Sequence, residues 1–112
     1  MVKAVPRNDD TPYEVVVQIR GNWCTAVVDS GAWRNFVSPG LVNKLQLPWK
    51  KKEVPYEVTN AEGYAFKYDD GQVSREIDHL PMYVKGYGRQ DVSFDITEIG
   101  GDELILGRPW LR

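Results

Sequence analysis

Cysteine and histidine are almost absent from this chain of 112 residues, which has one of each, Cys24 and His79. A single cysteine excludes an internal disulfide and, with it, the disulfide framework of a small secreted domain. One cysteine and one histidine also fall short of the three or four ligands of a zinc site. A catalytic Cys-His pair is an alternative, although a thiol within a strand is usually inert. We therefore expect no metal and no other cofactor.

Long apolar runs and an excess of one charge are also missing. The longest apolar runs are a few residues, far short of the about 20 that cross a membrane, and no secretion leader opens the chain. The chain has 14 basic and 16 acidic residues without a basic stripe. We interpret residues 50–52, three consecutive lysines, as a solvated cluster, because a nucleic-acid site needs more positive charge. Neither nucleic acid nor a membrane is an expected partner.

The pattern of apolar and polar residues indicates one small domain made mainly of strands. Residues 1–12 are polar and turn-prone and are predicted to be a flexible arm, with the domain at 13–112. Residues 13–20 alternate at period two, and the apolar pattern resumes at 23–28 after a predicted Gly21-Asn22 turn. Further short strands are predicted at residues 36–37, 54–59, 64–68, 72–77, 82–84, 92–96 and 104–107. This spacing predicts an all-β barrel or sandwich.

One helix is clearly signalled before the C-terminus. Ser38 is a suitable N-cap, and Pro39 suits the first helical position. Leucine and valine residues between positions 41 and 47 supply an apolar stripe, and Pro48 is predicted to end the helix.

The residues most suggestive of chemistry follow an apolar strand, where Asp29 is followed by Ser30, Gly31 and Ala32. Asp-Ser-Gly is also a common turn sequence, and such a triplet arises by chance in roughly one chain in twenty of this length. Alone, it is weak. The chain has no Gly-rich phosphate loop and no Gly-x-Ser-x-Gly elbow.

The triplet is one of several motifs whose order resembles the retropepsin family, specifically the protease domains of gypsy-type long-terminal-repeat retrotransposons. The resemblance covers about residues 13–112. The matching stretches are residues 27–32 (Val-Val-Asp-Ser-Gly-Ala), 35–38 (Asn-Phe-Val-Ser), the leucine-rich 41–48, the Gly-ended 60–63 and 105–111 (Ile-Leu-Gly-Arg-Pro-Trp-Leu).

This resemblance implies a small closed barrel with a flap hairpin and one or two short helices, and an aspartic endopeptidase activity. Asp29 would be the catalytic carboxylate. Two neighbouring carboxylates share a proton and can act as acid and base, but the chain has only one Asp-Ser-Gly triplet. The second Asp29 is therefore expected from an identical partner across a two-fold axis.

The resemblance also assigns roles around Asp29. Ser30 would hydrogen-bond across the dimer axis, while Gly31 and Ala32 would support the active-site loop. The flap tip is expected at Asn60, Ala61, Glu62 and Gly63. The substrate pocket and the packing beneath the loop are expected to use Trp33, Val58, Ile105, Leu106, Gly107 and Arg108. Viral relatives pair the equivalent arginine with an acidic residue, but Trp33 stands there, so Arg108 is expected to stack on Trp33.

The expected substrate is an extended polypeptide, part of a larger polyprotein, cut in the cytoplasm or within retrotransposon particles. Two alternatives remain. One is a retropepsin-shaped domain that binds or scaffolds without cutting, and the other is an unrelated small β domain in which Asp-Ser-Gly is only a turn.

Overall fold

The computed structural model describes residues 13–57 and 71–111 and confirms the all-β prediction. In chain order its elements are β1 (Glu14–Ile19), β2 (Asn22–Val28), β3 (Phe36–Val37), α1 (Pro39–Leu45), β4 (Lys50–Glu57), β5 (Gln72–Val84), β6 (Gly88–Ile96), β7 (Leu104–Leu106) and α2 (Arg108–Leu111). The predicted arm at 1–12 and the flap residues 60–63 lie outside the described residues. Neither described helix has the length and apolar content needed to cross a membrane.

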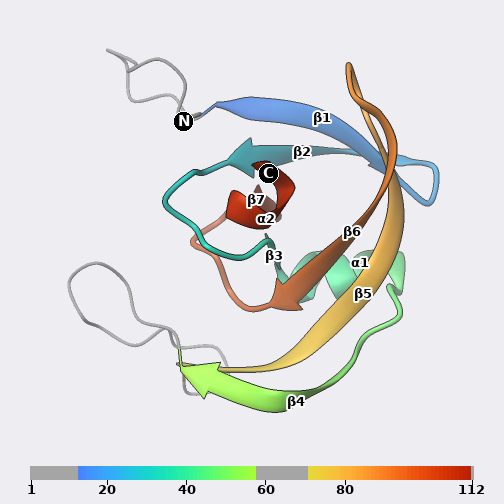
Figure 1. Cartoon of the computed structure of the whole chain (residues 1–112). Coiled ribbons are helices and arrows are strands. Elements are labelled where there is room, and N and C mark those ends of the chain that lie inside the picture. The colour runs from blue at the N-terminus through green and yellow to red at the C-terminus, as the bar shows by residue number, and fades with distance from the viewer. Residues whose placement is uncertain (1–12, 58–70, 112) are drawn as a thin grey trace.

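The strands form a closed barrel, as the resemblance implied. Their order is β1-β2-β7-β3-β6-β5, and β5 pairs with β1 to close the ring of six, while β4 extends from β5. Figure 1 shows the long, curved β5 running from β4 at one end to β1 at the other. Two pairings are parallel, β2 with β7 and β3 with β6. Through these pairings β7, β3 and β6 follow β2 in the order of the sheet, although β6 and β7 lie far from β2 in the sequence.

Alternation along β1 explains how the barrel is filled. Val15, Val17 and Ile19 are buried, whereas Glu14 and Val16 are exposed. Successive side chains of a strand point to opposite faces, so every second residue enters the barrel. The largest fully buried side chains are Phe94, Ile19, Leu41, Ile77, Leu80, Leu104 and Leu106. The core therefore draws on most of the strands and on α1.

The first hairpin turns one residue earlier than predicted. Ile19 pairs with Asn22, so the two turn residues are Arg20 and Gly21, with φ of 50° and 80°. Positive φ at both positions is the geometry of a type I′ turn, which matches the twist of the strands. The Asn22 side chain donates to the Arg20 carbonyl oxygen at 2.9 Å and stabilises this turn.

Helix α1 begins as predicted and ends earlier. The Leu41 backbone N–H donates to Ser38 Oγ at 3.1 Å, and Pro39 occupies the first turn, which confirms the N-cap. The helix ends at Leu45, because Gln46 takes the left-handed conformation with φ of 53°. The predicted end at Pro48 is therefore wrong.

Strand β5 was predicted as two strands and is one strand of 13 residues. The register to β6 shifts between Ile77 and Leu80, and His79 has φ of 52°, which describes a β-bulge. Pro81 lies within this strand although it lacks an N–H. At Pro81 the described residues pair β5 with β6 alone, so the missing N–H can face away from the ladder.

Candidate active site

Asp29 is the first residue after β2, and the parallel neighbour of that strand holds it there. Val27 and Val28 pair with Ile105 and Leu106 of β7. The pairing continues one step further, since the Asp29 N–H donates to the Leu106 carbonyl oxygen at 3.0 Å. The position of this carboxylate is therefore fixed by two apolar strands that fill the barrel.

The residues after Asp29 form a tight turn around its carboxylate. The Gly31 N–H donates to Asp29 Oδ1 at 2.8 Å, and the Ala32 N–H donates to the Asp29 carbonyl oxygen at 3.1 Å. A Cβ on Gly31 would lie 3.2 Å from Asp29 Oδ1. The small residue at this position leaves the half-buried carboxylate its room.

A second loop packs against this turn, and Gly107 makes the closest approach. A Cβ there would overlap the backbone carbonyl oxygens of Arg34 and Ala32, so only glycine fits without backbone movement. The next residue is bonded to the same turn, because the Arg108 N–H donates to the Ala32 carbonyl oxygen at 2.8 Å. Leu106 and Gly107 thus lie against the Asp29 loop, where they were expected.

Arg108 does not stack on Trp33 as expected. Its Nε donates to the Ser30 carbonyl oxygen at 3.0 Å, so the arginine braces the backbone of the Asp-Ser-Gly turn itself. The Trp33 side chain is 77% exposed and makes no ring contact with another described residue. A backbone carbonyl oxygen thus accepts from Arg108 at the place where the resemblance implied an acidic partner.

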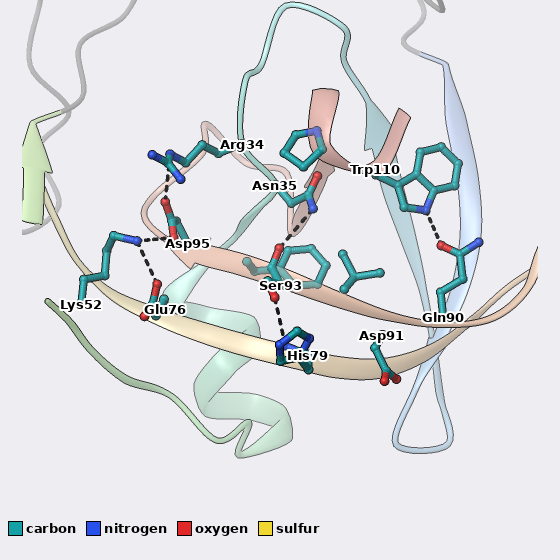
Figure 2. Close-up of a pocket in the computed structure, with 13 residues that line it drawn as sticks. Arg34, Asn35, Lys52, Glu76, His79, Gln90, Asp91, Ser93, Asp95 and Trp110 are labelled. Atoms are coloured by element: carbon teal, nitrogen blue, oxygen red, sulfur yellow. Dashed lines mark hydrogen bonds and ion pairs between the residues drawn. The ribbon is translucent and has the colours of Figure 1, made fainter. Parts of the chain in front are cut away.

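Asn35 is a supporting residue whose role the sequence did not reveal. It is 6% exposed, and its Oδ1 accepts from the Gly107 N–H at 2.8 Å. Its Nδ2 donates to the Ser93 carbonyl oxygen at 3.1 Å (Figure 2). One amide therefore joins the two loops to β6. The Asn-Phe-Val-Ser match gave the position but not these contacts.

A buried ionic cluster lies beside the active-site loop and was also missed. Asp95, on β6, is 6% exposed. Its Oδ1 accepts from Lys52 Nζ at 2.9 Å, and its Oδ2 accepts from the Tyr56 hydroxyl. Lys52 Nζ also lies 2.9 Å from Glu76, and Arg34 Nε lies 3.6 Å from Asp95. Figure 2 shows the side chains of Lys52, Glu76, Asp95 and Arg34 converging from β4, β5, β6 and the loop after Asp29.

This cluster corrects the solvated interpretation of the three lysines for Lys52, whereas Lys50 and Lys51 are exposed. Lys52 has a side chain only 11% exposed and lies in β4. Burial lowers the pKa of Lys52, but its hydrogen bonds to Glu76 and Asp95 outweigh burial and leave the pKa raised. Lys50 is on the surface but is also paired, with Asp78 at 2.7 Å.

The same cluster keeps Tyr56 neutral. Burial and then the hydrogen bond to Asp95 raise the pKa of the Tyr56 hydroxyl. A protonated hydroxyl can donate to the carboxylate, whereas a phenolate would repel it. The Lys52 ammonium group and the Tyr56 hydroxyl therefore both donate to the buried Asp95 carboxylate.

Two pockets flank the loop that follows Asp29. One, of about 520 Å³, lies over β6 and α2 and includes Asn35 and Asp95. The other, of about 820 Å³, lies between that loop and β4 and includes Trp33 and Tyr56. Of the expected pocket residues, Trp33 therefore lines a pocket, Ile105 is half-buried within β7, and Val58 lies outside the described residues.

Cys24 and His79 have separate, local hydrogen bonds. Cys24 Sγ lies 3.7 Å from the Asn22 carbonyl oxygen, and burial, followed by the charge of Glu103, raises the pKa of its thiol. The His79 N–H donates to Ser93 Oγ at 3.0 Å within the β5 bulge. A raised pKa leaves little thiolate, which argues against a nucleophilic cysteine.

The comparisons with known proteins agree with this geometry. A model of the PEG10/RTL1 protease domain matches residues 25–112. The chain belongs to the PEG10/RTL1 protease domain family. Its matched range contains the Asp29 turn, the Asp95 cluster and the Gly107 loop.

A solved structure supports the fold of this PEG10/RTL1 protease domain. The retroviral protease-like domain of Ddi1 from Leishmania major matches with a TM-score of 0.59 and 19% sequence identity, over 90% of this chain and 73% of that chain. The search of curated proteins gave no significant match. The predicted retropepsin-like family and barrel are thus confirmed, and the chain is a retropepsin-like protease domain.

Proposed function

We propose that this domain is an aspartic endopeptidase that works as a homodimer. The observation that carries the proposal is the Asp29 carboxylate at the end of an apolar strand, on a turn held by the Leu106 carbonyl oxygen and the Arg108 side chain. A catalytic group must be held in a productive geometry to within a fraction of an ångström. The backbone bonds at Asp29 support such rigidity.

The proposed chemistry needs two carboxylates. Two Asp29 side chains meeting across a two-fold axis would share one proton. The ionised member takes a proton from water while the water oxygen bonds to the peptide carbonyl carbon, and the protonated member donates to the carbonyl oxygen. The carboxyl that now holds the proton donates it to the amine nitrogen as the C–N bond breaks, and a hydroxyl of the tetrahedral intermediate returns its proton to the other carboxylate, so the pair again holds one proton.

The proposed substrate is an extended polypeptide, such as a segment of the polyprotein that contains the domain. β4 ends the strand order and, among the described residues, pairs only with β5. An unpaired strand edge can accept a peptide as an added strand. The pocket beside β4 would take the substrate's side chains. The proposed partners are thus a second copy of the chain and a polypeptide within the cell.

A second candidate is binding without hydrolysis. One protomer carries one Asp-Ser-Gly triplet, so an isolated protomer has half of the proposed acid–base pair. Such a protomer could hold a peptide in the pocket beside β4 but lacks the partner carboxylate needed to cut it.

A mixing experiment tests whether two chains share one site. Wild-type protein is held at a fixed concentration while increasing amounts of Asp29→Asn protein are added, and hydrolysis of a peptide library is followed. If each active site needs two Asp29 residues, mixed dimers are inactive, and an equal amount of variant lowers the activity per wild-type chain by about half. Energy transfer between wild-type and variant subunits that carry different fluorophores confirms that the subunits exchange.

Three results are informative. Activity that is unchanged by excess variant, despite exchange, would show that one chain suffices and would overturn the homodimeric mechanism. No hydrolysis by a stable wild-type dimer favours the binding candidate. A strict monomer without turnover favours it as well.

A further inference from the structure

The cluster around Asp95 holds one cation that the buried carboxylate does not need. Asp95 Oδ1 accepts from Lys52, and Oδ2 accepts from the Tyr56 hydroxyl. Both oxygens therefore have close donors before Arg34 is considered. Arg34 Nε lies 3.6 Å from Oδ2, beyond the usual hydrogen-bond distance of about 2.7–3.2 Å. Arg34 is attracted to the Asp95 carboxylate, but its hydrogen-bond donors are not used by it.

The guanidinium of Arg34 is oriented by its neighbours and open on its other side. Its Cζ lies 5.1 Å from the centroid of the Tyr56 ring, while Nε faces Asp95 (Figure 2). The side chain is still 55% exposed, and no described residue bonds its terminal nitrogens. A planar guanidinium held by one edge and one face presents its remaining donors as a fork that fits a carboxylate.

This open fork lines a pocket next to the catalytic turn. Arg34 follows Asp29 by five positions, and its carbonyl oxygen is packed against Gly107, so its backbone is fixed to the active-site loops. The pocket of about 820 Å³ also includes the aromatic residues Trp33, Phe36 and Tyr56. A volume in the range of about 300–1,000 Å³ accommodates a drug-sized ligand, and so more than one residue of a peptide.

The other charges of this pocket are close to balanced. Arg34 and three lysines from β4 line it together with three glutamates, at positions 53, 57 and 76. Lys50 is paired with Asp78 and Lys52 with Glu76. A preference for negative charge would then come from direct contact with a cation, either Arg34 or the exposed Lys51, rather than from the net field of the pocket. Of the two, only Arg34 is held in place by Tyr56 and Asp95.

The geometry points to Arg34 as a specificity-determining residue that binds an acidic side chain of the polypeptide substrate. Tyr56 and Asp95 are positioning residues that hold the guanidinium over the pocket. The neighbouring aromatic side chains would contact apolar parts of the same peptide. This inference rests on the proposed function, because it concerns the substrate of the same site.

The test uses pairs of peptides that differ by one glutamate or glutamine within a few residues of the scissile bond. Candidate sequences come from the library cleaved by the wild type. The glutamate peptide is expected to have a kcat/KM about fivefold higher than the glutamine peptide, mainly through a lower KM. The gain is modest because a solvent-exposed ion pair strengthens binding only slightly. The ratio should shrink as sodium chloride is raised. Arg34→Gln should bring the ratio of the two kcat/KM values to about one, and Arg34→Lys should keep part of the glutamate preference.

Arg89→Gln is the matched control, because Arg89 is an exposed arginine of β6 that does not line this pocket; its ratio should equal that of the wild type. Cleavage by the wild type without a glutamate preference, or a preference that survives Arg34→Gln, would overturn the inference and leave the protease proposal intact. If the wild type cleaves no peptide, the protease proposal fails. Fluorescence anisotropy then decides with labelled glutamate and glutamine versions of a library peptide that the wild type binds, and equal affinities for the two versions would refute the role of Arg34.

Discussion

Two aspartates of this domain have opposite surroundings. Asp29 is half-buried and is held almost entirely by backbone groups, namely the Gly31 N–H at its Oδ1 and the Leu106 carbonyl oxygen at its own N–H. Asp95 is 6% exposed and is surrounded by side chains, with Lys52 at 2.9 Å and the Tyr56 hydroxyl as donors. One carboxylate keeps an oxygen available for chemistry, and the other has both oxygens occupied.

The difference separates two tasks that the same side chain can perform. Backbone groups hold Asp29 without placing a charged side chain against its carboxylate. A water and a second carboxylate could therefore still reach it. Ionic partners make Asp95 a structural joint between β4, β6 and the loop after Asp29. Replacing each residue in turn should therefore affect activity and stability in opposite ways.

The largest effect is expected for Asp29→Asn. Without the carboxylate the acid–base pair is lost, and kcat/KM should fall by at least about a thousandfold. The asparagine oxygen can still accept from the Gly31 N–H, so the free energy of unfolding should change by less than about 0.5 kcal/mol. Peptide hydrolysis and denaturant unfolding measure the two quantities.

Asp102→Asn is the control, because Asp102 is an exposed turn residue and its replacement should alter neither quantity. Substantial hydrolysis by Asp29→Asn would contradict a catalytic role for Asp29.

The Asp29 site was predictable from sequence because its determinants are local. An apolar strand, a carboxylate and a glycine are consecutive, and the helix signal at Ser38 and Pro39 is equally local and was confirmed. Gly107 lies far along the chain and was found only through the family resemblance. The geometric reason for it, a close approach to the Arg34 and Ala32 carbonyl oxygens, needed the structure.

The Asp95 cluster was not predictable, because its residues are far apart in the sequence and the alternation of apolar and polar residues along β6 suggests that Asp95 is solvated. Lys52 and Asp95 are 43 positions apart. Alternation along β6 puts Val92, Phe94 and Ile96 on the core face and Asp95 on the opposite face, which is normally solvated. Lys52, Tyr56 and Arg34 cover that face instead. The bulge at His79 likewise made one continuous strand look like two.

Gly107→Ala tests how closely the backbone loops must pack around Asp29. The added Cβ would overlap two backbone carbonyl oxygens that cannot rotate away, so we expect a loss of about 3 kcal/mol or more in the free energy of unfolding. Hydrolysis should also fall, because the Asp29 turn must shift. Thermal and denaturant unfolding report the change.

Gly40→Ala is the matched control for that substitution. Gly40 lies in α1, and a Cβ there meets no atom within 4 Å. Alanine is the better helix former, so stability should rise by about 0.5 kcal/mol. Equal effects of the two substitutions would mean that the loop contact at Gly107 does not exist.

Asp95→Asn should have the opposite effects to Asp29→Asn, with a clear loss of stability and a much smaller loss of activity. Removing the charge leaves Lys52 with Glu76 alone and weakens a largely buried ion pair, so stability should fall by about 2–3 kcal/mol. Hydrolysis per folded molecule should fall far less than in Asp29→Asn, and this can be measured below the unfolding transition. Asp91→Asn, an exposed change on the same strand, should be neutral. A neutral Asp95→Asn would remove the contrast between the two aspartates.

The smallest effect is expected for Tyr56→Phe and concerns alkaline pH. Burial and the Asp95 hydrogen bond raise the pKa of Tyr56, and the pKa of Lys52 is also raised. Above about pH 10 the unfolded chain releases these protons while the folded protein keeps them, so wild-type stability falls as pH rises.

Tyr56→Phe removes one hydrogen bond and one of these protons. It should cost about 1 kcal/mol at pH 7, and this difference from the wild type should narrow as pH rises beyond about 10, because the wild type loses the same stabilisation there. Urea unfolding at intervals between neutral and alkaline pH measures both curves. Tyr83→Phe keeps the ring contact of Tyr83 with Trp23, at 6.2 Å between centroids, and should run parallel to the wild type. If the stability curve of Tyr56→Phe also runs parallel to that of the wild type, the Tyr56 hydroxyl does not stabilise Asp95. Lys52 would then be the side chain that holds Asp95, in contrast to the backbone groups that hold Asp29.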